Sequence, residues 1–439
     1  SVLPKAAAAN ANLFVSAENS QFQNYISGPQ VTEVVVIDSD IKDTDKGKGE
    51  PDVTVNGNKL RMVQATDGNW YGYFADQKQA QIADSIQNAG GVSYNGTGLD
   101  FGVFCASSTA VLGSTVSVVS TVGIALPWQP NNGGAQGVPN PGDSITTACT
   151  GNPSTTSAAR QNAVVRENKT VNSNSAVPRG QIGLSDGRYW PFIQLYNLNP
   201  SGNVVVQYNK GGGVQSTTLT FDTVEKFANL SADRTSYPQN GQVHLTLTNS
   251  ILNIDPTDED SWTFGTTPTN ATMYYQIFNE DGTAASNSKI SSALTGNTTA
   301  LMFNHNDLIK MNMNAQSGGN NVVDLQDNAD TVVNTAGNIN AGKQAITNQP
   351  LTFTETAPNT GVFGTYDEND LSVLAIDNSA QRGKSATIDY VDRAQSITIG
   401  FGFASKLERD KITVLRRSAE LHWSLRISIQ IVPSEVIFG

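Results

Sequence analysis

The sequence predicts an all-β protein that is rich in loops. Three observations lead to this fold class: the composition, a series of strand and turn signals, and a near absence of amphipathic helical patterns. Only 15% of the 439 residues are charged, and Asn, Thr, Ser and Gly are used heavily. These four residue types compete with helical hydrogen bonding and favour turns, and Thr also favours strands. At about 150 residues per domain, the length suggests roughly two to four domains.

Two β-hairpins are predicted from strand patterns that flank glycine turns. The first runs from 53 to 63, where Asn56-Gly57 supplies the positive φ angles of a tight turn. The second runs from 204 to 221 and turns at Gly211-Gly212-Gly213. Further strands are predicted where apolar residues alternate with polar ones. These alternating residues are Val243, Leu245 and Leu247, and then Ile397, Ile399 and Phe401.

The chain divides into four parts by composition. Residues 1–9 resemble the end of a secretory signal peptide, with a disordered Ala-rich start as the alternative. Residues 10–225 and 226–403 form the predicted β domains, with the boundary after the second hairpin. Residues 404–439 hold six Lys/Arg and four Asp/Glu and lack the Asn/Thr/Gly texture of the rest, so we expect an atypical tail, truncated or out of context.

The two cysteines, Cys105 and Cys149, predict one disulfide if the compartment is oxidising. Cys149 lies in the Pro/Gly/Asn/Ser-rich stretch 129–160, which we expect to be a long surface loop. A bond to Cys105 would tie this loop to its domain and limit its closure entropy. Two buried free thiols are the alternative.

The formal net charge of −12 argues against nucleic acid as the main partner, because that role requires a basic surface. An acidic surface instead attracts divalent and small cations. The sequence contains no run of about 18 apolar residues, so it predicts no membrane-spanning helix.

Residues 38–52 pose the main question about function, because they hold many carboxylates in one turn-rich connection. The EF-hand pattern does not fit, since a start at Asp38 would put Lys42 and Gly49 at ligand positions. Such a cluster repels itself unless it is solvated or neutralised by a hard cation, so Ca²⁺ binding and a solvated turn both stay open. The candidate ligands are Asp38, Asp40, Asp43, Asp45, Glu50 and Asp52.

A second acidic cluster lies in the segment NIDPTDEDSW, and the same two interpretations apply to it. Its candidate cation ligands are Asp255, Asp258, Glu259 and Asp260. Two looser clusters follow, one at residues 324–330 and one formed by Glu355 with the acids at 367–370.

Signals for catalysis in the sequence are weak. It has no His-Glu-x-x-His, and its Gly-x-Ser-x-Gly at residues 183–187 does not follow a predicted strand, as the nucleophile turn of a hydrolase would require. The P-loop-like stretch 337–344 places Gln344 where Ser or Thr would bind Mg²⁺. We therefore expect no enzyme. Five Asn-x-Ser/Thr sequons offer glycosylation sites in a secreted protein, at Asn95, Asn168, Asn229, Asn270 and Asn297.

Several longer stretches resemble the N-terminal part of the surface-layer proteins of ammonia-oxidising (thaumarchaeal) archaea. They include GPQVTEVVVIDSD, DGNWYGYFAD, NIDPTDEDSWTF and FTETAPNTGVFGTYDEND, and the likeness covers about residues 9–403. The tail departs from the family pattern, and family members continue through many more β modules.

The resemblance implies tandem immunoglobulin-like β-sandwich modules in a secreted protein that assembles with itself into a two-dimensional lattice at the cell surface. It also implies acidic loops that bind Ca²⁺ and a porous barrier that attracts cations such as ammonium. Two rival functions remain: a carbohydrate-binding or carbohydrate-hydrolysing β-sandwich and a monomeric adhesin. The former would show as a cleft with two carboxylates among aromatics such as Trp70, Tyr71 and Trp190.

Overall fold

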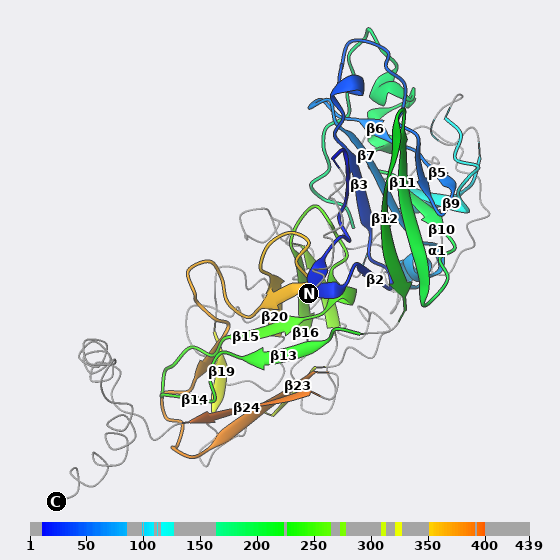
Figure 1. Cartoon of the computed structure of the whole chain (residues 1–439). Coiled ribbons are helices and arrows are strands. Elements are labelled where there is room, and N and C mark those ends of the chain that lie inside the picture. Colours follow the sequence, from blue (N-terminus) through cyan, green and yellow to red (C-terminus); the bar gives the residue numbers. More distant parts are fainter. Residues whose placement is uncertain are drawn as a thin grey trace, which may run out of the picture.

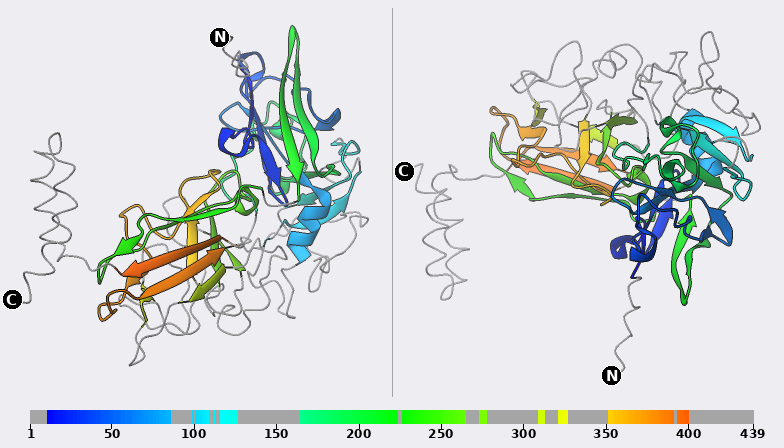
Figure 2. Two further views of the ribbon diagram at one scale, coloured as in Figure 1. Left: turned by 60° about the horizontal axis from the view of Figure 1, so that its bottom comes forward. Right: turned by 90° about the horizontal axis from the view of Figure 1, so that it is seen from above.

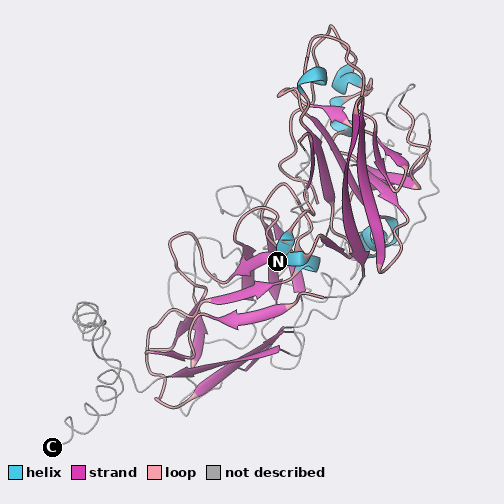
Figure 3. Cartoon of the chain, in the orientation of Figure 1, coloured by secondary structure: helices cyan, strands magenta, loops and turns pink. Residues whose placement is uncertain are grey.

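A computed structural model gives the structure of the chain, and its strands confirm the all-β class (Figure 3). The structure describes residues 11–85, 99, 101–108, 112, 116–126, 164–223, 226–264, 273–277, 309–312, 321–326, 351–390 and 393–399. The described strands form two lobes (Figure 1). We call residues 11–223 the first lobe and residues 226–399 the second lobe.

The described strands of the first lobe form two sheets that mix parallel and antiparallel pairs. The larger sheet has the order β1 (Leu13–Val15), β3 (Thr32–Val36), β7 (Trp70–Asp76), β10 (Ile193–Tyr196), β9 (Gly123–Leu126) and β8 (Val103–Ala106), with β6 (Val63–Gln64) paired to β7. The smaller sheet has the order β2 (Tyr25–Ser27), β12 (Gly213–Asp222), β11 (Gly202–Lys210), β4 (Val53–Val55) and β5 (Asn58–Leu60).

Both predicted hairpins form in the smaller sheet. β4 and β5 pair across Asn56 and Gly57, which have φ angles of 50° and 79°. β11 and β12 pair over their whole length, from Gly202 opposite Phe221 to Lys210 opposite Gly213. On β11 the buried residues Val204, Val206 and Tyr208 alternate with half-buried ones, as a strand with only one core face requires. The buried side joins the core that the two sheets share.

One α-helix, α1 (Gln77–Ser85), follows β7 and was not predicted. Its buried positions include Ala80 and Ala83, which are too small to give a strong amphipathic pattern. Asp76 fixes the start of the helix, because its carboxylate accepts a hydrogen bond from the backbone N–H of Gln79 at 2.9 Å.

The described strands of the second lobe form three sheets. The first has the order β13 (Asn229–Ala232), β15 (Leu245–Thr248), β21 (Val362–Gly364), β20 (Leu351–Glu355), β16 (Asp260–Phe264) and β17 (Met273–Ile277). The next has the order β14 (Ser236–Tyr237), β24 (Arg393–Ile399), β23 (Ser385–Tyr390) and β18 (Ile309–Asn312). β19 (Val323–Leu325) and β22 (Leu374–Ile376) form a separate pair.

The lobes are joined in sequence by the segment between β12 and β13, where the predicted boundary at residue 225 lies. In the described strands, every sheet draws its members from one side of this segment. The two views of Figure 2 show the lobes side by side. Residues 1–10, most of the stretch 129–160 and the tail from 404 lie outside the described residues.

Candidate functional site

The two lobes meet at a buried ionic cluster built around Arg166. This residue belongs to the first lobe, and its side chain is 7% exposed. Its guanidinium reaches the acidic segment 255–260 of the second lobe. Nε lies 3.0 Å from a carboxylate oxygen of Asp258, and Nη1 lies 3.4 Å from Asp260. The backbone N–H of Arg166 donates to Asp255 at 2.9 Å, so this carboxylate is also held from across the junction.

A network of hydrogen bonds fixes the carboxylates that face Arg166. Asp260 accepts hydrogen bonds from the backbone N–H groups of Ile254 and Asp255. Its own N–H donates to Glu355 on β20 at 3.0 Å. Glu355 also accepts from the N–H of Gly361 at 2.6 Å. The second acidic cluster of the sequence and Glu355, from one of the looser clusters, therefore form a single buried unit.

The cluster holds more carboxylates than cations, and burial shifts their protonation. Burial raises the pKa of Asp255 to about 6 even though the charge of Arg166 opposes this shift. Burial also raises the pKa values of Asp260 and Glu355. At Asp260 the positive charge of Arg166 opposes this rise. Burial alone would lower the pKa of Arg166, but the surrounding carboxylates raise it well above its ordinary value. The guanidinium thus stays charged while some of the carboxyl groups hold protons near neutral pH.

Neutral contacts between the lobes also contribute to the junction. The hydroxyls of Ser27 and Ser250 lie 2.7 Å apart, and the N–H of Val31 donates to the carbonyl of Ile254 at 3.0 Å. Gly361 has a φ of +63°, and a Cβ there would lie 2.7 Å from the ring of Phe22 in the other lobe. The lobes are therefore in close contact through both their backbones and their side chains.

The acidic loop 38–52 connects β3 to β4, as expected of an inter-strand loop, and half of its carboxylates contact side chains from outside the loop. Asp38 is buried, accepts from the hydroxyl of Tyr208 at 2.8 Å and pairs with Lys210 at 2.9 Å. Burial disfavours its charged form, but these donors hold its pKa below the ordinary value. Glu50 pairs with Arg61 at 2.8 Å, and Asp52 accepts from Asn209 at 2.9 Å.

The other three carboxylates of the loop face solvent. The side chain of Asp40 is 75% exposed, and that of Asp43 is 43% exposed and pairs with Lys48 at 3.1 Å. Asp45 is exposed. These three are the predicted ligands that a cation from solution can reach.

Side-chain amides, rather than carboxylates, hold the inside of this loop. Nε2 of the buried Gln64 lies 3.1 to 3.3 Å from the carbonyl oxygens of Ile41, Lys42, Asp43 and Gly68. Its Oε1 accepts from Asn172 at 2.9 Å and Gln181 at 2.7 Å. The last two amides also donate to carbonyls of the loop. We call Gln64, Asn172 and Gln181 the amide hub.

Within the part of the chain that the structure describes, no group of three or more His, Cys, Asp or Glu side chains has the geometry of a metal site. Three of the predicted ligands in the second cluster, Asp255, Asp258 and Asp260, pair with a guanidinium instead, and the fourth, Glu259, contacts it only through its backbone carbonyl. Ca²⁺ binding stays a prediction for both acidic segments.

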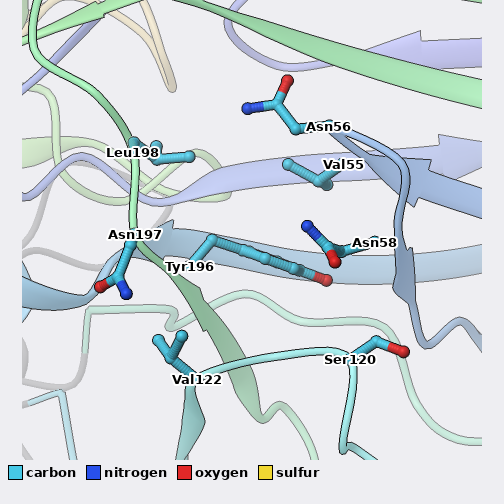
Figure 4. A pocket seen from close by; sticks show the side chains of 8 residues that line it. All are labelled: Val55, Asn56, Asn58, Ser120, Val122, Tyr196, Asn197 and Leu198. Atoms are coloured by element: carbon cyan, nitrogen blue, oxygen red, sulfur yellow. The ribbon is translucent and has the colours of Figure 1, made fainter.

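The aromatic residues that a sugar-binding cleft would need are buried. Trp70, Tyr71 and Trp190 belong to the core, and the two indole N–H groups donate to the backbone carbonyls of Ile41 and Lys169. A polar pocket of about 240 Å³ lies elsewhere, between the β4–β5 hairpin and the end of β10 (Figure 4). Its lining is Val55, Asn56, Asn58, Ser120, Val122, Tyr196, Asn197 and Leu198, without a carboxylate, imidazole or thiol.

The remaining predicted sites fall on both described and undescribed residues. Cys105 is buried on β8 and disulfide-bonded, and its predicted partner Cys149 lies outside the described residues. Asn229 is exposed on the edge strand β13, and Asn168 is half-buried two residues from Arg166. The sequons at Asn95, Asn270 and Asn297 lie outside the described residues.

Sequence reasoning did not find Arg166 or the amide hub. Arg166 lies about 90 positions from the acids that it contacts, so no local pattern connects them. The available signal was the buried setting of NIDPTDEDSW, where Ile254 and Trp262 flank carboxylates that must then be neutralised.

Comparison with known proteins adds no family. No family model matches the chain, and no curated protein matches it. Among the described residues, no helix combines the length and the apolar character needed to cross a membrane.

Proposed function

We propose that this chain is a structural, non-enzymatic component of a self-assembling surface layer, built from immunoglobulin-like β-sandwich modules. The observation that carries the proposal is the junction at Arg166, where one guanidinium bridges three carboxylates of the next lobe. A lattice subunit must hold its modules in a fixed orientation so that contacts repeat from copy to copy. Breaking a buried ion pair costs about 3–5 kcal/mol, so this junction resists bending.

The acidic character supports a cation-attracting role at a cell surface. We place the proposed Ca²⁺ at the outward carboxylates Asp40, Asp43 and Asp45, because Arg166 already fills the centre of the second cluster. A divalent ion there would reduce repulsion within the loop and between copies. A ligand that binds only the folded form also stabilises it. At the ionic strength of sea water, salt screens the electrostatic field within roughly several Å. The acidic surface would therefore attract cations mainly in narrow pores.

The test is electron microscopy of the purified chain with and without Ca²⁺, together with calorimetry. We expect ordered sheets in Ca²⁺ and a rise in melting temperature that EGTA reverses. The variant Asp40→Asn/Asp45→Asn should lose the calcium response but keep its fold, because neither residue is buried. Hydrolysis of a polysaccharide, or binding to a glycan without sheet formation, would instead favour the enzyme or adhesin alternatives.

A further inference from the structure

We infer that the outer face of the β11–β12 hairpin is a contact surface for the same face of a second copy of this chain. The inference rests on the proposed self-assembly and identifies the surface that would carry it. Figures 1 and 2 show this hairpin at the outside of the first lobe. We call this surface the neutral face and define it by Thr54, Val205, Gln207, Val214, Ser216 and Thr218.

The strand register places these side chains together. Val205 lies opposite Thr218, and Gln207 lies opposite Ser216 on one side and Thr54 on the other. Cross-strand partners point to the same face of a sheet. The neighbours that alternate with them, such as Val206 and Leu219, are buried in the core. The named residues therefore form the opposite side of the sheet, which is exposed or half-buried.

The chemistry of the neutral face differs from that of the whole chain. None of its six side chains is charged, whereas the chain carries a net charge of −12. The charged groups nearest to it by register are Asp52, just before β4, Lys59 on β5, which lies opposite Thr54, and Asp222 at the end of β12. Asp52 is hydrogen-bonded to Asn209, and Lys59 pairs with Glu50 at 3.4 Å.

Charge determines which partner this surface fits. Two copies that each carry a net charge of −12 repel one another. They can approach most closely where neither copy presents a charge. Hydroxyl, amide and small apolar groups also complement a surface of their own kind, because hydroxyls and amides both donate and accept hydrogen bonds. Val214 is 59% exposed and gains from being covered.

The size of the face indicates a weak contact that must be repeated to be stable. From Val214 to Thr218 the face spans roughly 17 Å along β12, and three strands span roughly 14 Å in width. The product, about 240 Å² per copy, is less than a third of the roughly 800 Å² per partner in a stable complex. Such a contact gains strength from the other contacts of an array.

The experiment compares two variants that add the same charge at different places. Thr218→Glu puts a carboxylate at an exposed position of the neutral face, and Thr387→Glu puts one on an exposed position of β23 in the second lobe. Self-association is measured by sedimentation equilibrium at high protein concentration, and circular dichroism checks the fold of each variant. We expect Thr218→Glu to weaken association about tenfold or more, and Thr387→Glu to change it little. Mixing Thr218→Glu with Thr218→Lys should restore association, because opposite charges would then face one another.

Three results would overturn the inference. The first is equal weakening by both variants, which would make net charge the cause. The second is wild-type protein that stays monomeric at every concentration. The third is that Thr218→Glu forms ordered sheets in Ca²⁺ as well as the wild type does. This result would leave the surface-layer function standing but exclude this face as a contact.

Discussion

Replacing Arg166 with methionine should destabilise the chain by about 3–5 kcal/mol, the usual cost of removing one partner from a buried ion pair. The methionine side chain preserves much of the apolar length of arginine but removes the guanidinium that contacts Asp255, Asp258 and Asp260. These carboxylates would remain in a site that excludes water. The hydrogen bond from Nη2 to the carbonyl of Glu259, at 2.6 Å, would also be lost.

The cost should depend on pH in a defined direction. Without the guanidinium, the buried carboxyl groups can remain uncharged only by binding protons. Their folded-state pKa values would rise further above the unfolded values, so stability would be greatest in acid and would fall as pH rises. We therefore expect Arg166→Met to cost more at pH 8 than at pH 5.

Urea denaturation at both pH values, followed by calorimetry, measures this prediction. Loss of the junction should also separate the unfolding of the two lobes into two transitions. Arg188→Met is the control, because the pair of Arg188 with Asp186 is partly exposed and lies within the first lobe. If the two variants had equal stability at both pH values, the buried cluster would not hold the lobes together.

Three further substitutions test the junction and the acidic loop. The wild type should lose stability as pH rises from about 4 to about 6, because the folded-state pKa of Asp255 is raised from 3.8 to about 6. Asp255→Asn should remove this loss, and urea titrations at several pH values measure how the free energy of unfolding changes with pH. Gly361→Ala should cost more than about 1 kcal/mol, since φ is +63° and the new Cβ would lie 2.7 Å from the ring of Phe22; a lowered melting temperature checks this. Gln64→Met should cost about 1–3 kcal/mol or more by leaving loop carbonyls without a donor, and faster hydrogen exchange in residues 38–48 would locate the damage.

The sequence predicts local features of this fold well. Asn56-Gly57 indicated the first hairpin because few residues tolerate the φ angles of that turn. The alternation at Leu245 and Leu247 indicated β15 because one side of that strand is buried. Both signals depend on the chain within a few residues of the element.

Features that depend on distant residues were not predicted. The acids of the second cluster were noticed, but their partner Arg166 comes from another lobe. Similarly, the carboxylates of the loop 38–52 attracted attention because they are charged. Its inner structure depends on Gln64 and Gln181, which carry no charge and lie far along the chain. A cluster of like charges indicates that something must neutralise it but does not identify what does.

Because of the amide hub, the path of the acidic loop does not depend on all of the charges that the loop carries. The three side chains of the amide hub donate hydrogen bonds to main-chain carbonyls, which every amino acid supplies. Asp40 and Asp45 contribute none of these contacts through their side chains. The outward charges of the loop can therefore be exchanged for neutral or basic residues while the loop keeps its path. This arrangement makes the loop a suitable place for adjusting the surface to a different salinity without redesigning the core.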